Sequence, residues 1–258
     1  MDRASVTGLF LGISALLLGQ WIEGGHVASL FRGTAGIIVI GGTLGATLLS
    51  VPLEDLRRST EIVGLVFSRS EFSIENAIEQ FSGLATVARK DGIVAIEELV
   101  EGFDDPFTRR ALGHVVDGVN EATLREILFT DIDVRMERDT AAAKVFDIAG
   151  GYAPTIGILG AVLGLIQAME SLSDPIQLGR GIAVAFIATI YGVGFANLIL
   201  LPLASKLHRI VAERRMNEEM IVEGAVALQG GLPPMAIRMR LLSYLRESIA
   251  EAKADHHS

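Results

Sequence analysis

The side chains that could catalyse a reaction or bind a metal are few and scattered. The five histidines stand at positions 26, 114, 208, 256 and 257, and the chain has no cysteine. No two of these histidines have the i, i+4 spacing that places metal ligands on one helix face. No Gly-x-x-x-x-Gly-Lys-Ser/Thr loop and no nucleophile–base pattern occurs. We therefore expect a protein that is not an enzyme, with no metal and no cofactor.

Two charged doublets offer a different chemistry. Arg89-Lys90 and Glu97-Glu98 lie eight residues apart around Gly92, which marks a turn. They could hold a partner protein of mixed charge, or pair with each other in an exposed salt bridge worth about 0–1 kcal/mol. The spacing alone favours the internal salt bridge.

Four stretches without Asp, Glu, Lys or Arg dominate the rest of the chain. They cover residues 4–22, 33–53, 148–169 and 181–205 and contain 19, 21, 22 and 25 residues. A bilayer core of ~30 Å requires about 20 apolar residues in a helix, and only a helix satisfies its own backbone in lipid. Buried helices of a soluble protein are the alternative, and four such runs are hard to cover in 258 residues. We therefore expect an all-α integral membrane protein with four spanning helices.

The first stretch could also be a cleaved signal peptide. Its apolar run exceeds the ~7–15 residues of a typical signal peptide, and Asp2 opposes Arg3 before it. We therefore expect it to be retained as a spanning helix.

The charged residues lie outside these stretches and are unevenly shared. Segment 54–147 holds 20 acidic and 11 basic residues, so it carries a net charge of −9, as does the whole chain. Tail 206–258 is nearly neutral, and a sequence pI near 5.1 argues against nucleic-acid binding. Basic residues flank the stretches on the sides of these two segments, which predicts that both segments and both termini are cytoplasmic. They are Arg57, Arg58, Arg69, Arg135, Arg138, Lys144, Lys206, Arg209, Arg214 and Arg215.

The two cytoplasmic segments have helical patterns. Apolar residues recur with a 3.6-residue period over 71–89, Gly92 ends that helix, and Asp105-Pro106 begins another. From Thr123 no Pro or Gly interrupts the pattern until Gly150, so one long helix should continue into the third span. The fourth span should likewise continue beyond residue 206. Another helix is expected over 237–249, before a frayed end at 255–258.

The spanning stretches contain no Asp, Glu, Lys, Arg or His, although such ionisable residues normally mark ion pathways. Either this chain moves no ions, or a partner supplies the titrating carboxylate. Glycines at i, i+4 spacing predict close helix packing, within the chain or between copies. They are Gly8/Gly12, Gly41/Gly45 and Gly160/Gly164. Pro154 and Pro202 fall towards the cytoplasmic ends of the third and fourth stretches and permit kinks.

These residues resemble the MotA/PomA family of flagellar motor stator proteins, over essentially the whole chain. Segment 153–166, APTIGILGAVLGLI, resembles the family's third spanning helix, and the residues from Asp174-Pro175 to Leu207 resemble its fourth. Arg89-Lys90-Asp91-Gly92 with Glu97-Glu98 resembles the family's cytoplasmic charged patch. Glu223-Gly224, Gly230 and Pro234-x-x-Ile237 resemble its tail.

The resemblance implies a homo-oligomer, a pentameric ring in the bacterial inner membrane around a single-pass partner of the MotB or PomB type. That partner brings the membrane Asp, which agrees with the missing carboxylate. The resemblance also implies that Arg89, Lys90, Glu97 and Glu98 contact the rotor protein FliG, that Pro154 and Pro202 couple ion passage to conformational change, and that Thr189 lines the ion path.

The resemblance also bears on the transported ion. Sodium-driven members of the family carry Thr where Ala161 stands and a Thr-Thr pair where Ala188-Thr189 stands. Na⁺ needs several oxygen ligands, so the loss of two hydroxyls favours H⁺. We expect Ala161 and Thr155 to border the same path as Thr189. The alternatives are an ExbB/TolQ-type energising subunit, a secondary transporter, which would need internal charge or unwound helices, and a passive membrane scaffold.

Overall fold

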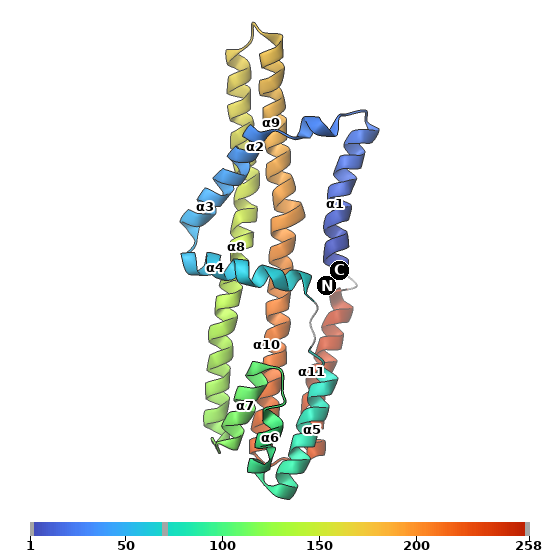
Figure 1. Cartoon of the computed structure of the whole chain (residues 1–258), viewed down its shortest axis with the longest axis vertical. Coiled ribbons are helices and arrows are strands. Elements are labelled where there is room, and N and C mark those ends of the chain that lie inside the picture. Colours follow the sequence, from blue (N-terminus) through green and yellow to red (C-terminus); the bar gives the residue numbers. More distant parts are fainter. Residues whose placement is uncertain (1–2, 69–71, 256–258) are drawn as a thin grey trace. The chain divides into compact units, whose positions relative to one another are not determined.

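The computed structural model describes residues 3–68 and 72–255, and within these ranges every regular element is a helix (Figure 1). Of the frayed end expected at 255–258, residues 256–258 fall outside these ranges, whereas Asp255 is the last residue of the final helix. Four helical stretches are long and apolar enough to cross a membrane. The prediction of an all-α membrane protein is therefore confirmed.

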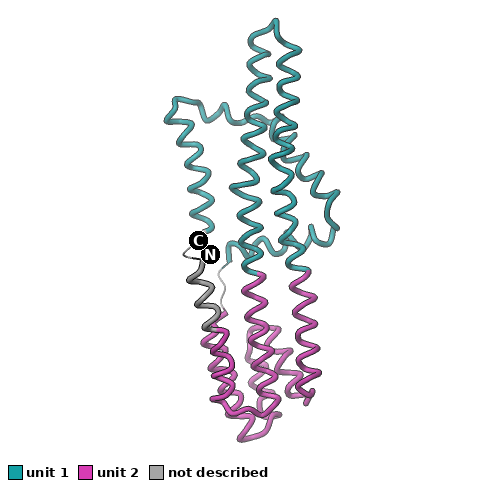
Figure 2. Tube along the Cα trace, turned by 180° about the vertical axis from the view of Figure 1, so that it is seen from behind, with its two compact units in different colours: residues 1–69, 138–210 teal, residues 70–137, 211–258 magenta. Residues whose placement is uncertain are grey.

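The chain divides into two compact units, coloured separately in Figure 2. Unit 1 comprises residues 1–69 and 138–210, and unit 2 comprises residues 70–137 and 211–258. Two of the three boundaries, after residues 137 and 210, fall inside long helices. Helix α8 runs unbroken over Glu121–Glu170 and α10 over Leu201–Gln229, so each contributes residues to both units. The predicted continuity of these two long helices is confirmed.

Unit 1 is centred on a hairpin of two helices. Helix α8 ends at Glu170, and α9 begins at Pro175 after Asp174, whose carboxylate accepts hydrogen bonds from the N–H groups of Ile176 and Gln177. Helix α9 ends at Phe195, and a π-helical turn, η5 (Ala196–Leu200), joins it to α10. The hairpin turn is tighter than the expected 170–180 connector, because α9 starts six residues before the charge-free stretch.

A slanted arm lies against this hairpin in Figure 1. It consists of α2 (Gly33–Gly36), the π-helical turn η2 (Ile37–Gly41) and α3 (Gly42–Ser50). Helix α1 (Arg3–Ile22) stands apart from the arm and is joined to it through η1 (Val27–Leu30). None of the 18 residues of its apolar window, Ser5–Ile22, is buried within the chain. Nothing in the sequence periodicity indicates the two π-helical turns.

A short helix, α4 (Leu53–Ile62), follows the arm and is anchored to α8 by charge. Arg58 donates from Nη2 and Nε to Asp139 Oδ1 over 2.7 and 2.8 Å, and the Asp139 side chain is almost fully buried. A small apolar cluster includes Ile62 of α4 and Val66 of η3 (Val63–Phe67), together with residues of α8 and α10. The α4 helix is thus part of unit 1, although the sequence reading assigned residues 54–147 to one loop.

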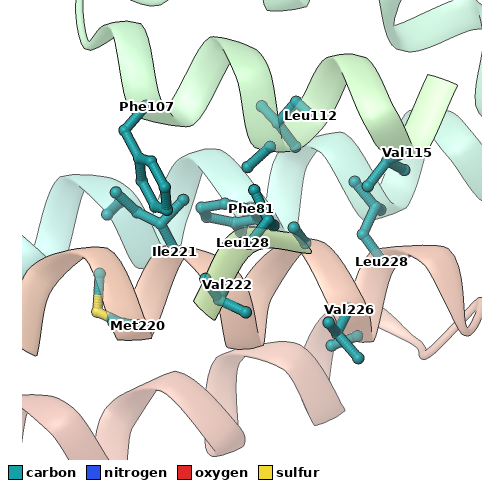
Figure 3. Packing of buried hydrophobic residues seen from close by; sticks show 14 of the residues in the cluster. Phe81, Phe107, Leu112, Val115, Leu128, Met220, Ile221, Val222, Val226 and Leu228 are labelled. Carbon is teal, nitrogen blue, oxygen red and sulfur yellow. The ribbon is translucent and has the colours of Figure 1, made fainter. Parts of the chain in front are cut away.

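Unit 2 is a helical domain with a continuous apolar core. Its elements are α5 (Ile74–Asp91), η4 (Ile93–Ile96), α6 (Glu97–Val100), α7 (Pro106–Val116), the start of α8, the end of α10, and α11 (Pro234–Asp255). Phe81, Phe107, Leu128, Ile221 and Leu228 converge in this core, as Figure 3 shows. As predicted, Gly92 ends α5 with φ of 92°, and Asp105 caps α7 through the N–H of Thr108 at 2.8 Å. Pro106 takes the first helical position of α7.

Candidate functional site

The α8–α9 hairpin is held together by glycines that leave no room for a side chain. A Cβ on Gly192 would lie 2.5 Å from the carbonyl oxygen of Ala153, and one on Gly164 would lie 2.7 Å from the backbone nitrogen of Ala185. Gly157 likewise meets the backbone of α9. Such contacts let two helices approach closely in lipid. The predicted packing role of Gly160 and Gly164 therefore applies inside one chain.

The other predicted glycine pairs behave differently. A Cβ on Gly8, Gly41 or Gly45 would meet no atom within 4 Å, whereas Gly12 lies near Leu198. Three of these four glycines consequently take no part in close packing within the single chain.

The residues expected to border the ion path lie at neighbouring levels of this hairpin. A Cβ on Gly160 would lie 2.8 Å from the Cβ of Ala188. Because the two helices are antiparallel, the next residue on each, Ala161 and Thr189, lies one residue to either side of this contact. The Thr189 hydroxyl donates to the carbonyl of Ala185 at 3.2 Å. Thr155, nearly two turns before Ala161, is exposed and donates to the carbonyl of Tyr152 at 2.8 Å. Both hydroxyls bond to their own helix, and their oxygens keep free lone pairs.

The two prolines lie in long helices without ending them. Pro154 is half-buried within α8, and Pro202 is exposed near the start of α10. Residues near them in unit 1 contact different partners. Ala153 lies against Gly192, whereas Gly150 lies against Leu200 and Leu201, next to Pro202. Both prolines therefore adjoin the contact between α8 and the continuous helix formed by α9, η5 and α10.

Two tyrosines that sequence reasoning missed join the hairpin to the α2–α3 arm. Tyr191 of α9 donates its hydroxyl to the carbonyl of Leu30 at 2.7 Å and accepts from the N–H of Arg32 at 3.2 Å. The hydroxyl of Tyr152 on α8 lies 2.7 Å from Ser50 Oγ of α3. The signal was available, because a tyrosine inside an apolar stretch needs a partner for its hydroxyl.

The charged doublets lie at the tip of unit 2, defined here as residues 89–99. Arg89 and Lys90 end α5, and Glu97 and Glu98 begin α6 beyond the turn at Gly92. All four side chains are exposed. None of them forms an ion pair with any part of the chain that the structure describes. The internal salt bridge that the spacing favoured is therefore absent, and the interpretation was wrong. A bridge between two long exposed side chains gains too little to fix its geometry.

Elsewhere in unit 2 several ion pairs join the elements behind the tip. Arg135 of α8 donates to both carboxylate oxygens of Glu218 on α10, and its guanidinium lies 4.7 Å from the ring centroid of Phe107 on α7. Glu223, one turn further along α10, pairs with Arg125 of α8 and Arg240 of α11. These pairs fix α8, α10 and α11 relative to one another, whereas the two doublets form no ion pair within the described chain.

The pKa values of Glu218 and Glu223 are shifted in opposite directions, because burial outweighs charge pairing at one and not at the other. Burial raises the pKa of Glu218 above its ordinary value, and the charge and hydrogen bonds of Arg135 only partly offset that effect. Burial also acts to raise the pKa of Glu223. There the hydrogen bonds and charges of Arg125 and Arg240 outweigh burial, and the pKa is lowered.

The fold and these two sites together define a class of membrane protein. One unit contains a helix hairpin that packs through glycines and has charge-free spanning stretches, and the other unit carries a charged tip. Residues 100–220 match the model of the MotA/TolQ/ExbB proton channel family. Motility protein A of Bacillus subtilis is 33% identical over 95% of this chain and 91% of that protein. The chemotaxis protein PomA of Vibrio alginolyticus is 30% identical over 96% of each chain.

Solved structures agree with these relatives. The flagellar MotAB stator complex from Bacillus subtilis matches with a TM-score of 0.87 and 32% identity, over 94% of this chain and 96% of that one. The chain therefore belongs to the MotA/PomA family of flagellar motor stator subunits.

Proposed function

We propose that this chain is the proton-driven stator subunit of its flagellar motor and works with a single-pass partner of the MotB type. The observation that carries the proposal is the α8–α9 hairpin. It holds the hydroxyls of Thr155 and Thr189 at neighbouring levels and contains no Asp, Glu, Lys, Arg or His in its charge-free stretches. Proton transfer through it therefore requires a carboxylate from another chain.

The similarity to a solved MotAB stator complex supports such a partner and a ring of copies of this chain. The ring would be a pentamer in the bacterial inner membrane. Co-purification of the tagged chain with a single-pass protein bearing one membrane Asp tests this assembly. Purification of the chain alone, in cells that express both proteins, would contradict it.

Proton rather than sodium coupling follows from the chemistry at Ala161 and Ala188. Neither alanine offers an oxygen ligand beside Thr189, whereas Na⁺ needs several oxygens to replace its water. Swimming should persist without sodium and stop with a proton uncoupler. Thr189→Val should lower torque, and Thr34→Val, at an exposed threonine of α2, is the matched control. Sodium-dependent swimming that survives an uncoupler would overturn the ion assignment. Unchanged torque in Thr189→Val would indicate a passive scaffold.

The two prolines adjoin the hairpin contact, and we assign them the coupling of proton passage to helix movement. A proline lacks the N–H of one helical hydrogen bond and so lowers the cost of a local bend. Pro154→Ala should reduce torque while the complex still assembles. Full torque in Pro154→Ala and in Pro202→Ala would remove this assignment.

The tip charges are assigned to the rotor protein FliG. Arg89, Lys90, Glu97 and Glu98 are exposed and form no ion pair within the described chain, so their charges are available to a partner. Arg89→Glu should impair torque, and a reversed charge on FliG should partly restore it. Arg109→Glu, at an exposed arginine of α7 outside the tip, is the control. Normal swimming of the Arg89→Glu and Glu97→Lys double variant would exclude the contact.

The proposed orientation places both termini and unit 2 in the cytoplasm. Because the chain lacks cysteine, single-cysteine labelling is unambiguous. A cysteine at position 23 should react with a membrane-impermeant reagent in intact cells, and one at position 90 should not. The reverse pattern would contradict the orientation. An ExbB/TolQ-type subunit, with its outer N-terminus, would instead be labelled at position 2.

A further inference from the structure

Two large apolar side chains lie exposed among the unpaired charges of the tip. Val94 of η4 is 64% exposed, and Leu99 of α6 is 47% exposed. Both belong to unit 2, outside the four membrane-spanning stretches, so a bilayer does not account for their exposure. Their neighbours behave normally, since Ile96 and Val100 are buried in the core of the unit. The chain therefore buries its alternate apolar residues here and leaves these two outside.

The backbone gives these side chains a fixed platform. The turn at Gly92 adopts a φ of 92°, which favours glycine, and η4 contacts α5, α6 and α7. In Figure 1 the end of α5 and the start of α6 form one end of the unit. Val94 and Leu99 are thus presented by residues that are anchored on both sides, through Ile96 and Val100.

The order of residue types along the tip matches the composition of a protein-binding surface. Basic Arg89 and Lys90 come first, with acidic Asp91 directly after them. Apolar Val94 follows, then acidic Glu97 and Glu98 and apolar Leu99. Protein interfaces combine an apolar centre that excludes water with a polar rim, and a few central residues supply most of the binding energy. Exposed charges chiefly steer the encounter and select the partner.

We propose that Val94 and Leu99 form the apolar centre of the rotor-binding surface and supply most of its salt-resistant affinity, while the four charges form its rim. The inference rests on the proposed contact with the rotor. The occupant it requires is a protein surface on which apolar side chains lie between a basic and an acidic group, complementary to the two doublets. Both signs of charge stand unpaired at the tip, which favours that occupant over an acidic membrane surface.

The salt dependence of binding separates the two contributions. Screening weakens contacts between exposed charges as salt rises, whereas apolar contacts persist. Val94→Ser and Leu99→Ser should each weaken binding of the purified stator complex to FliG about tenfold. The loss should be the same at about 0.05 M and about 0.5 M salt. Arg89→Glu should weaken binding strongly at low salt and little at high salt.

Val134→Ser is the matched control, because Val134 is a similarly exposed apolar residue of unit 2 on α8, 53% exposed and outside the tip. All variants should melt like the parent complex, since the replaced side chains lie at the surface. Leu99→Met, which keeps an apolar side chain, should restore most of the affinity that Leu99→Ser loses.

The outcomes distinguish the inference from the function on which it rests. If the Val94 and Leu99 variants bind FliG like the parent while Arg89→Glu does not, the apolar centre is excluded and the rotor contact stands. If none of the tip variants changes binding, both are excluded. If the serine variants instead change the number of copies in the complex, the tip joins copies of this chain and the inference fails.

Discussion

Arg135 donates two hydrogen bonds to the carboxylate of Glu218: Nη1 lies 2.9 Å from Oε1 and Nη2 lies 3.0 Å from Oε2. The same guanidinium contacts Asp131 through Nε at 3.2 Å and stacks over Phe107. The Glu218 side chain is only 8% exposed. One arginine therefore joins α7, α8 and α10 behind the tip, and a buried carboxylate depends on it.

Arg135→Ala should destabilise unit 2 by about 3 kcal/mol, because it leaves Glu218 buried without its counter-charge. Thermal unfolding of the purified complex in detergent measures the loss. The double variant Arg135→Ala with Glu218→Ala should recover part of it, since no unpaired charge remains. A double variant less stable than the sum of the two single losses would contradict this account.

The pH dependence of stability should differ between Glu218 and Glu223. The folded pKa of Glu218 is raised, so its contribution to stability is greatest at low pH and declines as pH rises through that pKa. The stability of Glu218→Gln relative to the parent should therefore increase as pH rises from about 4 to 7. The comparison is made with unfolding midpoints at each pH.

Glu223 provides the opposite control on the same helix. Its folded pKa is lowered, so its contribution is present above the ordinary carboxyl pKa and is lost as pH falls through the folded value. Glu223→Gln should be less stable than the parent near neutral pH, and the difference in stability should shrink on acidification. Parallel pH profiles for the two variants would show that burial and pairing do not differ as described.

Helix packing in unit 1 can be tested at two glycines two residues apart. Gly192→Ala places a methyl group 2.5 Å from the carbonyl oxygen of Ala153, whereas a Cβ on Gly194 meets no atom within 4 Å. Gly192→Ala should separate α8 from α9 and cost about 1–3 kcal/mol. Gly194→Ala should be neutral. Yield and thermal midpoint of the detergent-purified complex provide the comparison, and equal behaviour of the two variants would exclude the close contact.

The sequence predicted the elements well because their signals are local. Charge-free length indicated the spanning helices, and an unbroken pattern from Thr123 predicted the continuity of α8. Gly92 and Asp105-Pro106 correctly marked the end of α5 and the start of α7. Each of these depends on residues within a turn or two of one another.

The relationships between distant residues were not predictable in the same way. Arg58 and Asp139 are 81 positions apart, and Arg135 and Glu218 are 83 apart, so no spacing relates them. The salt bridge expected across Gly92 failed for the converse reason, because closeness in sequence does not outweigh the entropy of exposed side chains. Gly41 and Gly45 show the spacing of Gly160 and Gly164 but lack their contacts, since the facing helix decides whether a glycine is used.

The two tyrosines of unit 1 give the last prediction. Tyr191 bonds Leu30 and Arg32 before the arm, and Tyr152 bonds Ser50 at the arm's other end, so both ends of α2–α3 are fixed to the hairpin. Tyr191→Phe and Tyr152→Phe keep the ring and remove only the hydroxyl. Each should cost about 1 kcal/mol, as expected for hydrogen bonds between membrane helices.

A double-mutant cycle isolates the second bond. If Ser50 and Tyr152 act through their hydroxyls, Ser50→Ala should cost less once Tyr152 is Phe. The remaining cost is the bond from Ser50 Oγ to the carbonyl of Ala46 at 2.8 Å. The Tyr191 hydroxyl bonds only to backbone groups, so no side-chain substitution completes a cycle for it. The stability lost in Tyr191→Phe should add to that lost in Tyr152→Phe, because the two bonds lie at opposite ends of the arm. Strictly additive effects of Ser50→Ala and Tyr152→Phe would show that the hydroxyl pair contributes nothing at this end of the arm.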